Sequence, residues 1–132
     1  MALLLDDDYE NLAERGITFV EDEGLRAFIF TNFSLSEDLY TVSACDVLVI
    51  IPANYNQAGN DMFWTFPRLE RKDGQQIPNS CEVSGGDNRT SGGRVFCRWS
   101  RHWNEGPGVW RSGRDDIISI HRRIVAALKS PG

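Results

Sequence analysis

The segment "TVSACDVLVIIP", residues 41–52, limits the possible folds more than any other part of the chain. In an extended conformation one face would be apolar through Cys45, Val47 and Val49, and the other face would also be apolar through Leu48 and Ile50. A strand that is apolar on both faces must lie inside a sheet or be covered on both sides. The segment therefore predicts the central strand of a covered sheet.

Further strands are expected on both sides of this segment. Residues 17–21 and 25–33 alternate with a period of two around an Asp-Glu-Gly turn, which predicts a hairpin. Residues 61–67 and 94–99 also have strand-like composition. The polar, glycine-rich residues 68–93 between them are expected to form a long loop.

Two helices are expected, one near each end of the chain. Asp7 and Glu10 have the spacing of a capping box, and Gly16 is suited to close a short first helix. Residues 115–129 place apolar side chains at helical spacing, with acidic residues first and Lys129 last. The predicted fold class is α+β: one domain of residues 1–132 with an N-terminal helix, an antiparallel meander, a long loop and a C-terminal helix, both helices packing on one face of the sheet.

Composition excludes several classes of protein. The net charge of −5 argues against a general nucleic-acid binder, although the stretch "RVFCRWSRHW" is locally basic. No apolar run approaches the roughly 20 residues that cross a bilayer, and the N-terminus lacks the basic region of a signal peptide. The three cysteines include no CxxC pair, which favours free thiols in a reducing compartment. We expect a cytoplasmic protein without membrane or nucleic-acid partners.

The three cysteines differ in their expected burial and in the expected reactivity of their thiols. Cys45 lies among valines and isoleucines and is expected in the core. Cys81 lies in the long loop beside Glu82, whose charge would raise a thiol pKa. Cys97 stands between arginines that could stabilise a thiolate, although a strand would bury it on one face with Trp99. Both a catalytic and a buried role are open for Cys97.

Other chemistries have weaker support. The histidines and cysteines show no paired ligand spacing, so no metal is expected. The glycine-rich residues 84–93 lack the lysine of a phosphate-binding loop, and no nucleophile elbow surrounds Ser100. No cofactor is expected.

Three blocks of sequence resemble a known family. Pro52 and Tyr55 match the Pro-x-x-Tyr-Pro loop of the ubiquitin-conjugating (UBC) superfamily, with Asn56 in place of the second proline. Residues 61–64 (Asp-Met-Phe-Trp) with 98–102 (Arg-Trp-Ser-Arg-His), and residues 110–115 that begin the last helix, resemble its prokaryotic family E. The resemblance extends from Asp7 to Leu128 and implies a UBC-like fold.

The resemblance also implies a pathway. Members of this family typically accompany a ThiF-like activating enzyme and a ubiquitin-like or multi-ubiquitin protein, sometimes with a JAB peptidase, in systems associated with phage defence. Conjugating enzymes place the cysteine after a His-Pro-Asn turn in a Gly-x-x-Cys stretch. This chain has Ile77-Pro78-Asn79 instead, and Gly93 precedes Cys97 by four positions. Glutamine is frequent at the Cys97 position in family E.

Two functional hypotheses follow from the residues and the resemblance. In the first, Cys97 (or, as a minor candidate, Cys81) carries a ubiquitin-like C-terminus as a thioester, and Asn79 or the backbone N–H groups of its loop would stabilise the oxyanion. Arg94, Arg98, Arg101 or His102 would favour the thiolate, or the arginines would hold an acidic partner. In the second, the chain is a non-catalytic adaptor that binds the modifier or the activating enzyme. Its contact residues would then be Trp99, Trp103 and Trp110 with the neighbouring arginines, although at least one of these tryptophans should be core.

Overall fold

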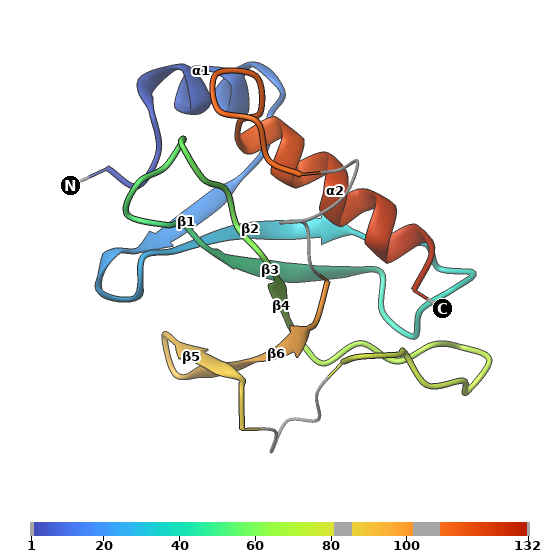
Figure 1. Cartoon of the computed structure of the whole chain (residues 1–132). Coiled ribbons are helices and arrows are strands. Elements are labelled where there is room, and N and C mark those ends of the chain that lie inside the picture. The colour runs from blue at the N-terminus through green and yellow to red at the C-terminus, as the bar shows by residue number, and fades with distance from the viewer. Residues whose placement is uncertain (1, 81–85, 102–108, 132) are drawn as a thin grey trace.

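The computed structural model describes residues 2–80, 86–101 and 109–131. Within these residues, two α-helices, a short 3-10 helix and six strands follow one another (Figure 1). In chain order they are α1 (Asp6–Glu14), β1 (Phe19–Asp22), η1 (Glu23–Leu25), β2 (Ala27–Ser34), β3 (Ala44–Ile50), β4 (Phe63–Phe66), β5 (Arg89–Ser91), β6 (Arg94–Trp99) and α2 (Ile117–Lys129). The α+β class predicted from the sequence is confirmed.

The strands form one antiparallel sheet in the order β1-β2-β3-β4-β6-β5. The first four strands are the predicted meander, and β3 lies inside the sheet between β2 and β4, as its two apolar faces require. β6 pairs with β4, so the chain between them returns to the sheet edge that β4 leaves open.

The prediction that residues 68–93 form one long loop is wrong. Residues 89–91 form β5, which makes a hairpin with β6, and Arg71 bridges to Tyr40. Gly92 and Gly93 have φ angles of +60° and +77°, a left-handed turn that suits two glycines between paired strands. Three residues are too few to show the alternation that identified the other strands, so the sequence pattern did not reveal β5.

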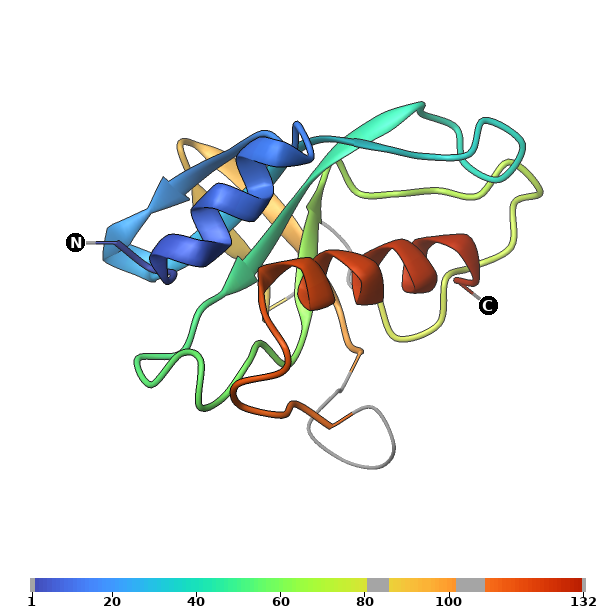
Figure 2. The same cartoon turned by 90° about the horizontal axis from the view of Figure 1, so that it is seen from above.

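Both helices lie on the same face of the sheet (Figures 1 and 2), as predicted. The main core lies between them and the sheet. It includes Phe28 and Phe30 of β2, Val47 and Val49 of β3, Phe63, Trp99, and five residues of α2: Ile117, Ile118, Ile120, Ile124 and Leu128. Neither α1 nor the 13-residue α2, the helices of the described residues, has the length and apolar character to cross a membrane.

The opposite face of the sheet carries a second, smaller core. Its buried members are Ala27, Ile29, Leu48, Trp64 and Phe96. The sheet curls around this cluster and brings its two edge strands together. The hydroxyl of Ser91 on edge strand β5 donates to Asp22 on the other edge strand, β1, at 2.7 Å. The curl explains how a sheet with helices on only one face can bury apolar side chains on both.

The two helices are joined by the buried carboxylate of Asp8, which is 3% exposed. One oxygen accepts the backbone N–H of Leu5, the N-cap of α1, at 3.1 Å, and the other accepts the N–H of Ile117, the first residue of α2, at 3.1 Å. The Asp7–Glu10 capping box predicted from the sequence is therefore wrong, because Asp8 performs this role. Asp116 caps α2 through the N–H groups of Ile118 and Ser119.

Replacing Asp8 by alanine should lower the free energy of unfolding by about 1–3 kcal/mol, because two buried N–H groups lose their acceptor. Chemical denaturation followed by circular dichroism measures the change. Asp7→Ala is the control, since Asp7 is exposed in the same helical turn. Equal losses from the two variants would contradict the role of Asp8.

Candidate functional site

The segment Ile77-Pro78-Asn79-Ser80 lies against the end of β6. The N–H of Ser100 donates to the carbonyl of Asn79 at 2.7 Å, and Ser80 bridges to Trp99. Asn79 has a φ of +56°, and the hydroxyl of Ser80 closes the turn on the carbonyl of Ile77 at 2.9 Å. We call residues 77–80 with 99–101 the loop–strand junction.

Arg101 connects the loop–strand junction to the residues that follow α2. Its guanidinium donates to the carbonyls of Pro78 at 3.0 Å and Pro131 at 3.2 Å, and lies 5.0 Å from the ring centroid of Trp99. Trp99 is 1% exposed and stacks on Phe63 with ring centroids 5.2 Å apart. The expectation that at least one of the three tryptophans belongs to the core is met by Trp99.

Cys97 lies inside the sheet, opposite Thr65 of β4. Its residue is 1% exposed, and the alternation of β6 places its side chain on the same face as Trp99. A thiol acts as a nucleophile only when it ionises and can be reached by its electrophile. In this conformation Cys97 is packed like a core residue.

Cys45 is a second buried thiol, 4% exposed, in β3. Burial, with a smaller contribution from the charge of Asp46, raises the pKa of the Cys45 thiol to about 12. The expectation that Cys45 is a core residue is confirmed.

The arginines of β6 extend to the opposite face from Cys97. Arg94 forms an ion pair with Asp46 at 2.7 Å and lies 5.0 Å from the ring centroid of Phe96. Arg98 forms an ion pair with Asp87. Neighbours along a strand point to opposite faces, so these guanidinium groups cover the second core.

Trp110 attaches the segment before α2 to the loop between β3 and β4. Its indole N–H donates to the carbonyl of Asn56 at 2.8 Å, and its ring lies 5.8 Å from that of Tyr55. The ring also packs directly on Gly59, where any Cβ would overlap it. The role of Gly59 could not be predicted from the sequence, because a single glycine in a loop does not reveal which ring will pack on it.

Tyr55 belongs to the loop that Trp110 contacts, and it is half-buried beside the N-termini of the two α-helices. Its hydroxyl is buried near Asp8 and Asp116. Burial above all, and then the charges of Asp8 and Asp116, raise the pKa of Tyr55 far above its ordinary value. The Tyr55 phenol therefore stays protonated and uncharged near pH 7, where it packs beside the N-termini of the two α-helices.

Three residues predicted for the site, Cys81, His102 and Trp103, lie outside the described residues. Within residues 2–80, 86–101 and 109–131, no three His, Cys, Asp or Glu side chains are grouped so that they could hold a metal ion.

The structure combines a curled antiparallel sheet with two helices on one face of it. Residues 4–131 match the family model described as Prokaryotic E2 family E. The chain belongs to this family. The searches of curated proteins and of solved structures returned no match.

Gly59→Ala should destabilise the protein by about 1–3 kcal/mol, because the added methyl group must displace the indole of Trp110 or the loop beneath it. Thermal unfolding should show a lower Tm. Gly86→Ala is the matched control, since no atom lies within 4 Å of the position its Cβ would take. An unchanged Tm for the Gly59 variant would show that Trp110 is not held as described.

Iodoacetamide should label neither Cys45 nor Cys97 in the folded protein, because both thiols are buried and that of Cys45 titrates near 12. Labelling at pH 8.5 followed by mass mapping, in a Cys81→Ser background, tests this. Both sites should react after denaturation in guanidinium chloride. Labelling of Cys97 in the native protein would show that β6 opens in solution.

Proposed function

We propose that this protein is the ubiquitin-conjugating-like component of a prokaryotic modification pathway, with a UBC-like fold, and that it handles a ubiquitin-like or multi-ubiquitin protein delivered by a ThiF-like activating enzyme. The family match over residues 4–131 supports this general role. The pathway partners and a part in antiphage defence are proposed on the family resemblance alone.

Within this role, the geometry favours an adaptor that binds its partners without forming a thioester. The observation that carries this choice is the burial of Cys97, which is 1% exposed and paired with Thr65 in the β4–β6 ladder. A carbonyl carbon cannot approach the thiol while both strands remain in place. Arg94 and Arg98 keep 35% and 26% of their side-chain exposure, so each can still meet a carboxylate of a partner.

A thioester-forming enzyme is the second candidate, favoured by the position of the loop–strand junction. The turn that replaces His-Pro-Asn lies against the end of the strand that contains Cys97, and Ser100 binds the carbonyl of Asn79 at 2.7 Å. In this reaction the thiolate attacks the carbonyl carbon of the modifier's thioester on the activating enzyme. A new carbon–sulfur bond forms, and the activating enzyme's thiolate leaves. Cys97, or Cys81, would be the nucleophile, and the Asn79 turn would stabilise the oxyanion.

A reconstitution distinguishes the two candidates. The protein is incubated with the ThiF-like enzyme and the ubiquitin-like protein from its own gene neighbourhood and ATP, then separated on gels with and without reductant. The adaptor proposal expects no reducible adduct, and equal affinity for the modifier or the activating enzyme in the wild type and the Cys81→Ser/Cys97→Ser variant.

A reducible band that disappears in Cys97→Ser and persists in Cys81→Ser would replace the adaptor with an enzyme that uses Cys97. The opposite pattern would assign the nucleophile to Cys81. Absence of both an adduct and binding to either partner would overturn the pathway role itself.

A further inference from the structure

A cleft of about 260 Å³ lies beside the second core, on the face of the sheet that the helices do not cover (Figure 1). Ile50, Met62 and Trp64 supply its apolar wall, and Ile50 and Met62 are only partly buried there. The rest of its lining consists of Pro52, Gly59, Asn60, Asp61 and Arg89. None of these residues contributes to the loop–strand junction, so the cleft is separate from the site described above.

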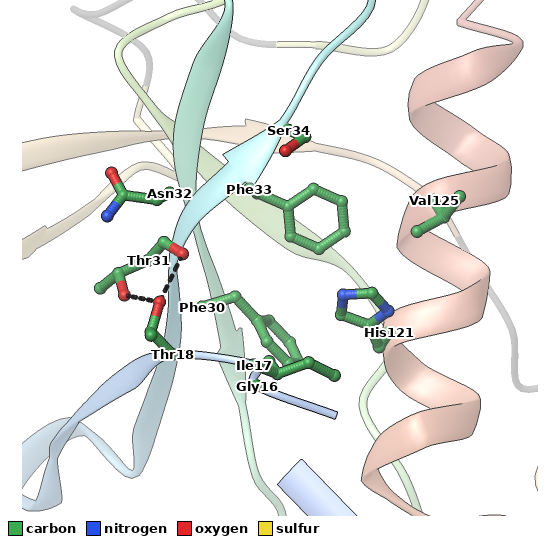
Figure 3. A pocket seen from close by; sticks show the side chains of 10 residues that line it. All are labelled: Gly16, Ile17, Thr18, Phe30, Thr31, Asn32, Phe33, Ser34, His121 and Val125. Atoms are coloured by element: carbon green, nitrogen blue, oxygen red, sulfur yellow. Dashed lines mark hydrogen bonds between the residues drawn. The ribbon is translucent and has the colours of Figure 1, made fainter. Parts of the chain in front are cut away.

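A second cleft, of about 350 Å³, lies between β2, α2 and the turn that joins α1 to β1 (Figure 3). Phe33 and His121 point toward each other across it, and its lining contains no Asp, Glu, Lys or Arg side chain. The smaller cleft is lined by one cation and one anion, Arg89 and Asp61. Charged groups at an apolar cleft fix the orientation of a ligand and select its chemistry, so the smaller cleft, which we call the Arg89 cleft, is the more specific of the two.

The cation of the Arg89 cleft is held in place on an aromatic ring. The guanidinium of Arg89 lies 4.9 Å from the ring centroid of Trp64, which is 3% exposed and donates its indole N–H to the carbonyl of Asp87 at 2.9 Å. Arg94 and Arg98, on the same face, have carboxylate partners. Within the described residues the guanidinium of Arg89 has no ion pair or hydrogen bond. A guanidinium that is stacked on a ring keeps its N–H edge open to a carboxylate.

Two neighbouring residues of the lining supply acceptors. Asn60 is 2% exposed and donates from Nδ2 to the carbonyl of Met62 at 3.1 Å, but its Oδ1 has no hydrogen-bond partner in the described part of the chain. A buried acceptor without a donor is unfavourable, which favours a ligand that brings an N–H group to it. Asp61 follows in the lining, and the roughly four lone-pair sites of a carboxylate can accept more than one donor.

Trp110 holds the loop that contains these acceptors. Its indole N–H donates to the carbonyl of Asn56 at 2.8 Å, and its ring packs on Gly59, which itself lines the cleft. This wall of the cleft is therefore fixed by packing before any ligand arrives. A preformed site loses less conformational entropy on binding than a site that must be ordered.

We propose that the Arg89 cleft binds a free α-amino acid with an apolar side chain. The carboxylate of the amino acid pairs with Arg89. Its ammonium group donates to Oδ1 of Asn60 and to the carboxylate of Asp61. Its side chain lies against Ile50 and Met62.

The charges and the size of the lining favour this class of ligand. One cation and one anion match a zwitterion, whereas a phosphate or another dianion would meet a single cation, Arg89, and the negative charge of Asp61. The volume of about 260 Å³ lies just below the roughly 300 Å³ at which pockets for drug-sized ligands begin, which suits a smaller molecule. This binding is independent of the handling of a ubiquitin-like protein.

Titration of the ¹⁵N-labelled full chain with L-leucine, followed by NMR, tests the proposal. The amide signals of residues 59–62 and 89 and the indole signal of Trp64 should shift and reach saturation. Glycine lacks the apolar side chain, L-leucinamide lacks the carboxylate and N-acetyl-L-leucine lacks the ammonium group, so each should bind about tenfold more weakly than leucine. The absence of a saturable shift with leucine, shifts confined to other residues, or equal binding of any of the three related compounds would overturn the proposal.

Matched variants test the two charged contacts. Arg89→Gln should weaken the binding of leucine about tenfold, and Arg114→Gln, which removes an exposed arginine outside the cleft, should leave it unchanged. In Arg89→Gln, leucine and leucinamide should bind alike, a result that a general loss of packing would not produce. Asp61→Asn should weaken the binding of leucine but not that of N-acetyl-leucine.

Circular dichroism shows whether each variant is folded. If Asp61→Asn proves misfolded, the comparison of leucine with leucinamide in Arg89→Gln decides. Undiminished affinity for leucine in folded Arg89→Gln, or a preference for leucine over leucinamide that persists in it, would overturn the proposal.

Discussion

The carboxylate of Asp8 fixes the relation between the two ends of the chain. It is almost fully buried and accepts one hydrogen bond at the start of each helix, from Leu5 and from Ile117, which is 109 residues further along the sequence. A helix N-terminus carries partial positive charge, so a buried carboxylate is stabilised where two such termini meet. This one side chain links the starts of both helices, and the main core lies between these helices and the sheet.

The alternation of β6 separates two kinds of chemistry that appear mixed in the sequence. Cys97 and Trp99 face the main core, whereas Arg94 and Arg98 face the second core and neutralise Asp46 and Asp87. Arginines that seem to surround the thiol in the sequence are therefore on the other side of the sheet. The local basic character of "RVFCRW" serves the packing of a curled sheet in an acidic protein.

The sequence predicted the elements whose signals are long and periodic. β3 has two apolar faces over seven residues and α2 has an apolar stripe, so both elements were expected close to their true places. Asp115 and Asp116 were expected in the first turn of the last helix, but both precede it, and Asp116 is its N-cap. β5 was missed because three residues cannot show a period. The cap of α1 was assigned to Asp7 because neighbouring aspartates have equal local propensity, and only the distant N–H of Ile117 selects Asp8.

The candidate site could be predicted only in part, for the same reason. Cys45 was placed correctly because the residues that follow on its face of the strand, Val47 and Val49, are apolar, and its burial needs no knowledge of distant segments. The contacts of Arg101 with the carbonyls of Pro78 and Pro131 join residues separated by 23 and 30 positions. No local pattern encodes such pairs, since they arise only when the sheet has closed.

The described parts of the sequence blocks that carry the family resemblance contact one another in the structure. Phe63 pairs with Trp99 and Trp64 with Arg98, and the Tyr55–Asn56 segment receives the ring and the N–H of Trp110. Such contacts serve the packing of the fold, and a fold alone does not fix the chemistry that a protein performs. Membership of the family therefore establishes the class of protein, and the burial of Cys97 decides which of the two functions the geometry favours.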